Sequence, residues 1–326
     1  MIKIISPLLI AGVVLFLPFC VEGQVVSTGG NPLFPGADPD ITISNGKYWI
    51  YPTNKTGFDT PNEFYAYSSP DLRTWTKEGP ILSLDQIQWI GADGAPKHFL
   101  WAPGIFQKNG KFYLYYAVGP QGKTPSRVGV AVGTSPDGPF LDSGQPLVTG
   151  GHGFEAIDPM VFDDTKNGKV YLYAGGSAGS KLRVYELNPD LVSIAKEIPV
   201  ENPTNFTEGV YMTERNGIYY LSYSHGHWDN NTYSVHYCMA PSPIGPWTYK
   251  GPILTSTDKD WGPGHHAFFQ NPKTGQWYIV YHRWNNVVDG KKPPCRSVCI
   301  DLLEFDQNGN ILPVKMTDTG VEPSPL

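Results

Sequence analysis

Three acidic residues, one tryptophan and one histidine stand at the same point of five similar segments of this 326-residue chain. The segments open with ADPDI at residue 37, WAPGI at 101, IDPMVF at 157, TEGVYM at 207 and GHHAFF at 264. The residues concerned are Asp38, Trp101, Asp158, Glu208 and His265. Asp and Pro are poor strand formers. An acid before one strand pattern means little, but its recurrence along the chain indicates a site.

Separate carboxylates beside an aromatic wall suit the binding of a sugar. The tryptophan ring can stack on the CH face of the sugar, and the carboxylates can accept hydrogen bonds from its hydroxyls. Two carboxylates on opposite sides of a bound sugar can also cleave it. One protonates the leaving oxygen while the other activates water, across a gap of about 6.5–9.5 Å. A third acid can raise the pKa of the proton donor by like-charge repulsion.

Each segment continues with the same pattern of elements. A short strand is followed by a tight turn, an aromatic-rich strand such as FYLYYA or IYYLSY, and two further strands. Asn-Gly pairs tolerate the positive φ angles of tight hairpins. The five turns are Asn45-Gly46, Asn109-Gly110, Asn167-Gly168, Asn216-Gly217 and Thr274-Gly275.

Four antiparallel strands repeated five times predict an all-β fold, a five-bladed β-propeller. We expect the blades over about residues 34–316, within one catalytic domain of residues 24–326. The first strand of each blade lines the central channel and begins at one mouth. The five residues above should therefore converge on one funnel, while Tyr113, Tyr115 and Tyr116 pack between blades. A β-sandwich is the alternative, but it would not explain the in-phase repetition.

The constellation resembles glycoside hydrolase family 43, the inverting five-bladed propeller enzymes of plant cell-wall breakdown. The five openings quoted above and WYIVYHR at residues 277–283 carry the resemblance, which covers nearly the whole chain after residue 23. It implies that Asp38 is the general base and Glu208 the general acid. Asp158 would modulate the pKa of the donor and orient it. No organic cofactor is implied.

The resemblance also implies binding residues. Trp101 would lie at the sugar subsite, Arg283 would bond hydroxyls of the terminal sugar, and His265 would belong to a hydrated, structural calcium site. Asp40, two residues after Asp38, is the alternative candidate for the general base. His266, next to His265, is the alternative candidate for the calcium ligand.

The favoured activity is an exo-acting α-L-arabinofuranosidase on arabinan, arabinoxylan or xylan side chains, working as a monomer. β-Xylosidase, endo-arabinanase and galactan hydrolase are the alternatives within the family. Many relatives have an acid after WAP where this chain has Gly104, which leaves the subfamily open. Related fructan and sucrose hydrolases would need Asn-Asp-Pro-Asn and Glu-Cys motifs. This chain has Ala-Asp-Pro and Glu-Gly at the corresponding positions. A non-catalytic sugar-binding propeller would be expected to lack one of the three acids.

Residues 1–23 read as a secretory signal, with Lys3 as the basic end and cleavage before Gln24, so we expect a secreted, extracellular protein. The apolar core of roughly 13 residues is too short to span a bilayer; a retained anchor is the alternative. Cys20 would leave with the signal. The remaining three cysteines allow at most one disulfide: Cys238, Cys295 and Cys299. Sequons for N-glycosylation occur at Asn54, Asn205 and Asn230.

The composition excludes some partners. A formal net charge of −6 without a basic stripe argues against nucleic acid. After the first 23 residues, no segment is long and apolar enough to predict a membrane span. The 36 glycines and 31 prolines favour many short strands joined by turns.

Overall fold

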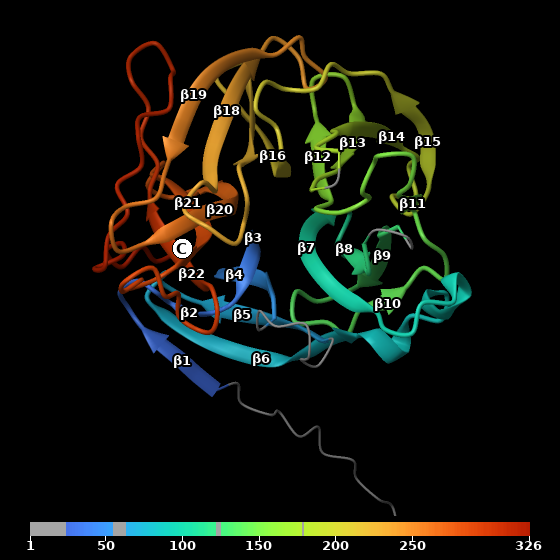
Figure 1. The fold of residues 1–326 in the computed structure, drawn as a ribbon, viewed down its shortest axis with the longest axis horizontal. Helices are drawn as coiled ribbons and strands as arrows, with labels where there is room; N and C mark the ends of the chain where they lie inside the picture. Colours follow the sequence, from blue (N-terminus) through green and yellow to red (C-terminus); the bar gives the residue numbers. More distant parts are fainter. Residues whose placement is uncertain (1–23, 55–62, 122–124, 178) are drawn as a thin grey trace, which may run out of the picture.

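The computed structural model describes residues 24–54, 63–121, 125–177 and 179–326. These residues form five antiparallel sheets arranged around a central axis (Figure 1). The predicted five-bladed β-propeller is therefore confirmed. The predicted signal of residues 1–23, including Cys20, lies outside the described residues.

The first strand of each blade is the innermost one, and the blades follow one another in chain order (Figure 1). Blade one contains β3 (Ala37–Ser44), β4 (Lys47–Thr53), β5 (Glu63–Ser69) and β6 (Thr74–Ser83), with β1 (Gln24–Thr28) added outside β6. The short 3-10 helices η1 (Leu84–Gln86) and η2 (Ile90–Asp93) lead to blade two. Blade two contains β7 (Phe99–Lys108), β8 (Lys111–Gly119) and β9 (Arg127–Gly133), and β9 pairs with both β10 (Leu141–Asp142) and β11 (Val148–Thr149).

Blades three and four have four strands each. Blade three contains β12 (Met160–Asp164), β13 (Lys169–Ala174), β14 (Arg183–Leu187) and β15 (Ile194–Ile198). Blade four contains β16 (Glu208–Arg215), β17 (Ile218–His225), β18 (Ser234–Ala240) and β19 (Thr248–Leu254). Blade five contains β20 (Trp261–Gln270), β21 (Trp277–Trp284), β22 (Ser297–Leu302) and, as its outer strand, β2 (Phe34–Pro35).

The origin of this outer strand corrects the sequence prediction, which took all four strands of blade five from the C-terminal part of the chain. Phe34 pairs with Val298 and Pro35 with Ser297, so the N-terminal segment closes the ring. Residues 303–326 form no strand and run past blade one, where Ser324 N–H donates to the Asp71 carbonyl. Pairing the two ends of the chain in one sheet ties the first and last blades together.

The core lies between blades rather than inside any one of them. Each of five apolar clusters joins two neighbouring blades, since one face of every sheet packs on the next. Tyr115 and Tyr116 are adjacent on β8 and point to opposite neighbours, blade three and blade one. Both are fully buried and Tyr113 nearly so, which confirms their packing role.

The hairpin turns also follow the sequence. Both residues of Asn45-Gly46, Asn109-Gly110 and Asn216-Gly217 have positive φ, as a type I′ turn requires. Among the described residues, no helix has the length and apolar character needed to cross a membrane.

Candidate active site

A backbone irregularity recurs at the start of the first strand in every blade. One residue there has a positive φ between 38° and 61°: Asp38, Ala102, Asp158, Gly209 and His265. In blades one, two, four and five, the pairing register with the second strand shifts across this residue. Such β-bulges turn the strand and redirect its side chains. The same feature thus presents the predicted residues at one mouth of the channel, with Trp101 and Glu208 one position earlier.

Asp38 is held through both carboxylate oxygens. Thr53 Oγ1 donates to Oδ2 at 2.7 Å, and Arg296 Nη1 donates to Oδ1 at 3.2 Å. His282 Nδ1 lies 3.3 Å from Oδ1. Burial by itself would raise the pKa of Asp38, but Arg296, His265 and His282 outweigh burial and hold it well below the usual range. Asp38 is therefore an ionised, fixed carboxylate, as a general base must be.

His265 lies between two of the acids. Its Nδ1 is 3.5 Å from Asp38 Oδ1 and 3.5 Å from Asp158 Oδ2. Burial lowers the pKa of His265, so the imidazole is neutral near pH 7. A neutral imidazole can connect the two carboxylates without a permanent charge.

Asp158 and Glu208 form the other side of the group. Asp158 Oδ2 accepts a hydrogen bond of 2.8 Å from the Gly209 amide, directly after Glu208. Burial, then the charges of Glu208 and Asp38, raise the pKa of Asp158 well above its usual range. Tyr233 Oη donates to Glu208 Oε1 at 2.8 Å, and Ser177 Oγ donates to Oε2 at 2.5 Å. The three predicted acids are therefore brought together, each with its own set of partners.

Trp101 presents a half-buried ring beside this group. It lies parallel to Phe99, with ring centroids 5.6 Å apart and an interplanar angle of 2°. A Cβ on Gly119 would stand 2.3 Å from the Trp101 ring, so the glycine makes room for it. A partly exposed aromatic ring in this place suits the CH face of a sugar.

Arg283 does not join the acids, contrary to the sequence prediction. Its side chain is 1% exposed and its Nε donates to Asn285 Oδ1 at 2.6 Å. Its Nη1 lies 3.6 Å from Asp260 Oδ2, and its Nη2 donates to Asp318 Oδ1 at 3.3 Å. Successive strand residues face opposite sides, so His282 reaches Asp38 while Arg283 is enclosed within the protein. A side chain so enclosed has no surface to offer a sugar.

Five partners of the acids were not singled out from the sequence, and they come from four blades: Thr53, Ser177, Tyr233, His282 and Arg296. The WYIVYHR motif indicated the strand that carries His282, but the residue predicted from it to bind the sugar was the next one, Arg283. The others occur at strand ends or in loops with no repeat pattern to mark them.

Asp40 and His266, the two neighbouring alternatives, have other partners. Asp40 accepts hydrogen bonds from the amides of Ile41 and Ile105. His266 is 2% exposed, with Nε2 2.7 Å from Ser222 Oγ. The partners of Asp40 and His266 in the described part of the chain lie away from the three acids, which leaves Asp38 and His265 as the better candidates.

The described residues do not fit a calcium site built from side chains. They contain no group of three or more His, Cys, Asp or Glu side chains able to hold a metal ion. Calcium prefers several oxygen ligands, whereas His265 offers a nitrogen.

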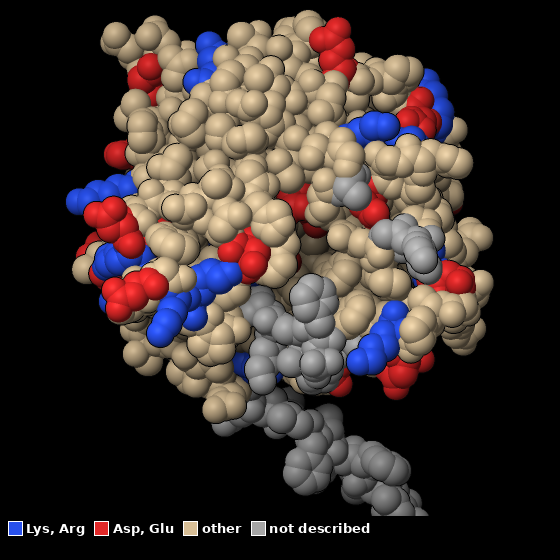
Figure 2. Space-filling view, in the orientation of Figure 1, with Lys and Arg blue, Asp and Glu red and all other residues tan. Residues whose placement is uncertain are grey.

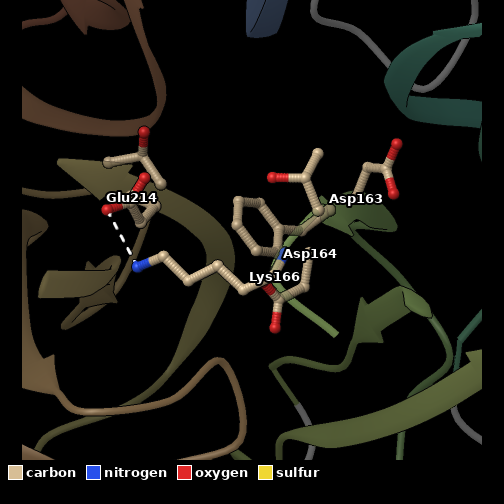
Figure 3. Close-up of a pocket in the computed structure, with 7 residues that line it drawn as sticks. Asp163, Asp164, Lys166 and Glu214 are labelled. Atoms are coloured by element: carbon tan, nitrogen blue, oxygen red, sulfur yellow. Dashed lines mark hydrogen bonds and ion pairs between the residues drawn. The ribbon is translucent and has the colours of Figure 1, made fainter. Parts of the chain in front are cut away.

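Figure 2 shows acidic side chains recessed near the centre of one face of the ring. A hollow of about 210 Å³ lies between the turn after β12 and the end of β16 (Figure 3). Lys166 and Glu214 meet across it at 3.2 Å. Because β12 and β16 begin near Asp158 and Glu208 and end here, this hollow is at the opposite face and separate from the acids.

The predicted modification sites differ in their surroundings. Asn205 is exposed, and its Nδ2 donates to Tyr249 Oη at 3.3 Å. Asn230 is half-buried, with Oδ1 accepting from the Thr232 amide. Asn54 is half-buried, and the rest of its sequon lies outside the described residues. Of the cysteines in the described residues, all three are free thiols: Cys238, Cys295 and Cys299.

Comparisons with known proteins agree with this geometry. The family model "Glycosyl hydrolases family 43" matches residues 30–311. The beta-D-galactofuranosidase xynD of Aspergillus niger is 39% identical over 90% of this chain and 87% of its own.

Solved structures show the same fold. A thermostable family-43 glycoside hydrolase superimposes with a TM-score of 0.73 at 27% identity, over 92% of this chain and 99% of its own. A β-xylosidase/α-arabinofuranosidase from a compost metagenome, solved with xylotriose in a calcium-free form, has a TM-score of 0.69 at 28% identity, over 89% and 98%. With the family model spanning all five blades, the chain belongs to glycosyl hydrolase family 43, whose members hydrolyse glycosidic bonds with inversion and without an organic cofactor.

Proposed function

We propose that this chain is a secreted, monomeric, exo-acting α-L-arabinofuranosidase that removes terminal sugars from plant polysaccharides. Asp38 is the base, Glu208 the acid and Asp158 the residue that orients the acid. Trp101 forms the wall of the terminal sugar subsite. The family membership supports the reaction, and the shape of the mouth supports the exo mode.

The observation that carries the exo mode is a wall over blades four and five. Residues 226–233, the blade-four loop, join β17 to β18, and residues 285–296, the blade-five loop, join β21 to β22. Trp284 Nε1 donates to the Trp228 carbonyl at 3.2 Å, and Lys292 Nζ donates to the Asp229 carbonyl at 2.5 Å. We infer that two loops joined in this way limit access to the site from one side, which favours a chain end over a chain interior.

The hydrolysis then follows from the contacts of the acids. Glu208 gives its proton to the glycosidic oxygen while Asp38 takes a proton from water attacking the far face of the anomeric carbon. The C–O bond to the leaving group breaks as the C–O bond to water forms. Asp158 fixes the backbone after Glu208 through the Gly209 amide, and burial together with the charges of Glu208 and Asp38 raises the pKa of Asp158 well above its usual range.

A β-D-galactofuranosidase is the second candidate, because the Aspergillus niger relative carries that name. β-D-Galactofuranose has the same ring arrangement as α-L-arabinofuranose and one further carbon on its side chain. One pocket can therefore accept both sugars if it leaves room for that carbon. β-Xylosidase, endo-arabinanase and galactan hydrolase remain the alternatives within the family.

The test is release of sugar from a panel of aryl α-L-arabinofuranoside, aryl β-D-galactofuranoside, aryl β-D-xyloside, linear arabinan, arabinoxylan and β-1,3-galactan. Arabinose as the sole small product is the expected result. Galactose or xylose would move the assignment to those sugars, and oligomers from arabinan would show endo cleavage. No product from any substrate would favour the non-catalytic sugar-binding alternative.

Calcium, secretion and glycosylation are separate parts of the proposal. The proposal of a calcium ion at His265 rests on the family resemblance alone. If neither a chelator nor added calcium changes the activity, this part of the proposal is wrong. Secretion rests on residues 1–23, and the N-terminal sequence of the mature protein tests it. Mass measurement before and after deglycosylation tests the sequons at Asn54, Asn205 and Asn230.

A further inference from the structure

The blade-four loop contacts both sides of the catalytic group. Its last residue, Tyr233, is 1% exposed and donates to Glu208. Trp228, in the middle of the loop, lies beneath the guanidinium of Arg296, with 4.9 Å between Cζ and the ring centroid. Arg296 in turn donates to Asp38. One loop is thus connected to the acid directly and to the base through a single side chain.

The half-buried Trp228 ring packs against three protein side chains. Trp284 stacks near it at 6.4 Å and 25°, and His227 at 6.1 Å and 20°. Arg296 lies over the ring, where a guanidinium gains both cation–π attraction and stacking. These contacts give Trp228 defined partners within the protein, of which Arg296 is the one that reaches Asp38.

Arg296 needs such support because of where it lies. It stands at the end of the blade-five loop, directly before β22, and its long side chain has many rotamers. Its Nη1 is 3.2 Å from Asp38 Oδ1 and 3.2 Å from His282 Nε2. These two contacts use the same nitrogen, so a small shift of the guanidinium would weaken the two of them together.

We propose that Trp228 is a positioning residue for hydrolysis: its indole holds the Arg296 guanidinium against the Asp38 carboxylate. The proposal deepens the proposed function and rests on Asp38 as its base. With Thr53 on one oxygen and Arg296 on the other, Asp38 cannot rotate away from the attacking water. Without Trp228, Arg296 would sample other rotamers and Asp38 would lose one of its two anchors.

The experiment compares Trp228→Phe with Trp228→Leu on whichever aryl glycoside of the panel the wild type cleaves. Phe retains an aromatic face, whereas Leu retains apolar volume without one. We expect Trp228→Leu to lower kcat about tenfold, the scale of one lost hydrogen bond to a charged group, with KM changed less than about twofold. Trp228→Phe should stay within about threefold of the wild type, since Phe still binds a cation.

A double-mutant cycle adds a second readout. If Trp228 acts through Arg296, then Trp228→Leu should slow the Arg296→Ala enzyme no further. Lys166→Ala is the control, because it removes the ion pair with Glu214 at the opposite face of the ring and leaves the Trp228 ring beneath Arg296. That control should stay within about twofold of the wild type, and melting curves check that each variant is folded.

Three results would overturn the proposal: a Trp228→Leu kcat equal to the wild type, losses that add to those of Arg296→Ala, or a change confined to KM. The last would make Trp228 a sugar contact. Asp38→Asn tests the proposed function independently. If that variant kept full activity, the assignment of the base would fail whatever Trp228 does.

Discussion

Asp40, two residues after Asp38 in the sequence, accepts at Oδ2 a hydrogen bond of 2.7 Å from the backbone amide of Ile105, which joins blade one to blade two. Its Oδ1 accepts from the Ile41 amide at 2.8 Å. Burial raises the pKa of Asp40 to about 7, although both amide contacts lower it. Asp40 thus fastens two blades and titrates near neutral pH.

Asp40→Asn should change how stability depends on pH. The pKa of Asp40 is about 7 in the folded chain and 3.8 as the ordinary value, so between these pH values only the folded state holds the proton. This stabilises the fold as pH falls from 8 to 5. Asn does not titrate, so the substitution should cost about 1–2 kcal/mol more at pH 5 than at pH 8, allowing for the partial exposure of Asp40. Denaturant unfolding at both pH values measures the difference, and an equal cost at both would contradict the prediction.

Gly104→Ala should destabilise the chain. A Cβ at this position would stand 2.2 Å from the Pro159 carbonyl oxygen, directly after Asp158. The backbone of blade two or three must move, which should cost about 1–3 kcal/mol and lower kcat as well. Gly79→Ala is the control, since nothing lies within 4 Å of its added Cβ. Equal melting temperatures for the two variants would show that the approach of Gly104 to Pro159 is not restrictive.

Arg283→Ala should lower stability rather than sugar binding. The change leaves Asp260, 3% exposed, without its buried cation. Breaking a buried pair in this way typically costs about 3–5 kcal/mol. Thermal unfolding should show a large loss, while KM of the folded fraction should stay near that of the wild type. A raised KM with unchanged stability would restore the sugar-binding role expected from the sequence.

Glu208→Gln should abolish turnover and retain binding. Gln keeps the shape of the side chain, and its amide oxygen can still accept from Ser177 while its NH2 group donates to the Tyr233 hydroxyl oxygen, but it has no acidic proton to give the leaving group. Loss of a general acid lowers kcat by about 10²–10⁴-fold. Calorimetric titration with the product sugar checks that the site still binds. Turnover at the wild-type rate would exclude Glu208 as the acid.

The repeated pattern in the sequence determined the architecture. Hairpins with Asn-Gly turns and aromatic second strands recur in phase, and only neighbouring blades can bury such strands. The same recurrence identified Asp38, Asp158 and Glu208, since equivalent positions in a ring must meet near its axis. The structure confirms the five blades and brings the three acids together.

Other features were decided only by the tertiary structure. Within Tyr-His-Arg, the strand face alone determines that His282 reaches Asp38 and Arg283 packs against Asp260; a one-residue error in the face exchanges the two. The closing strand comes from Phe34–Pro35 because the ring joins the two ends of the chain. Arg296 and Tyr233 reach the acids from irregular loops, whose contacts link residues far apart in sequence and follow no periodic pattern.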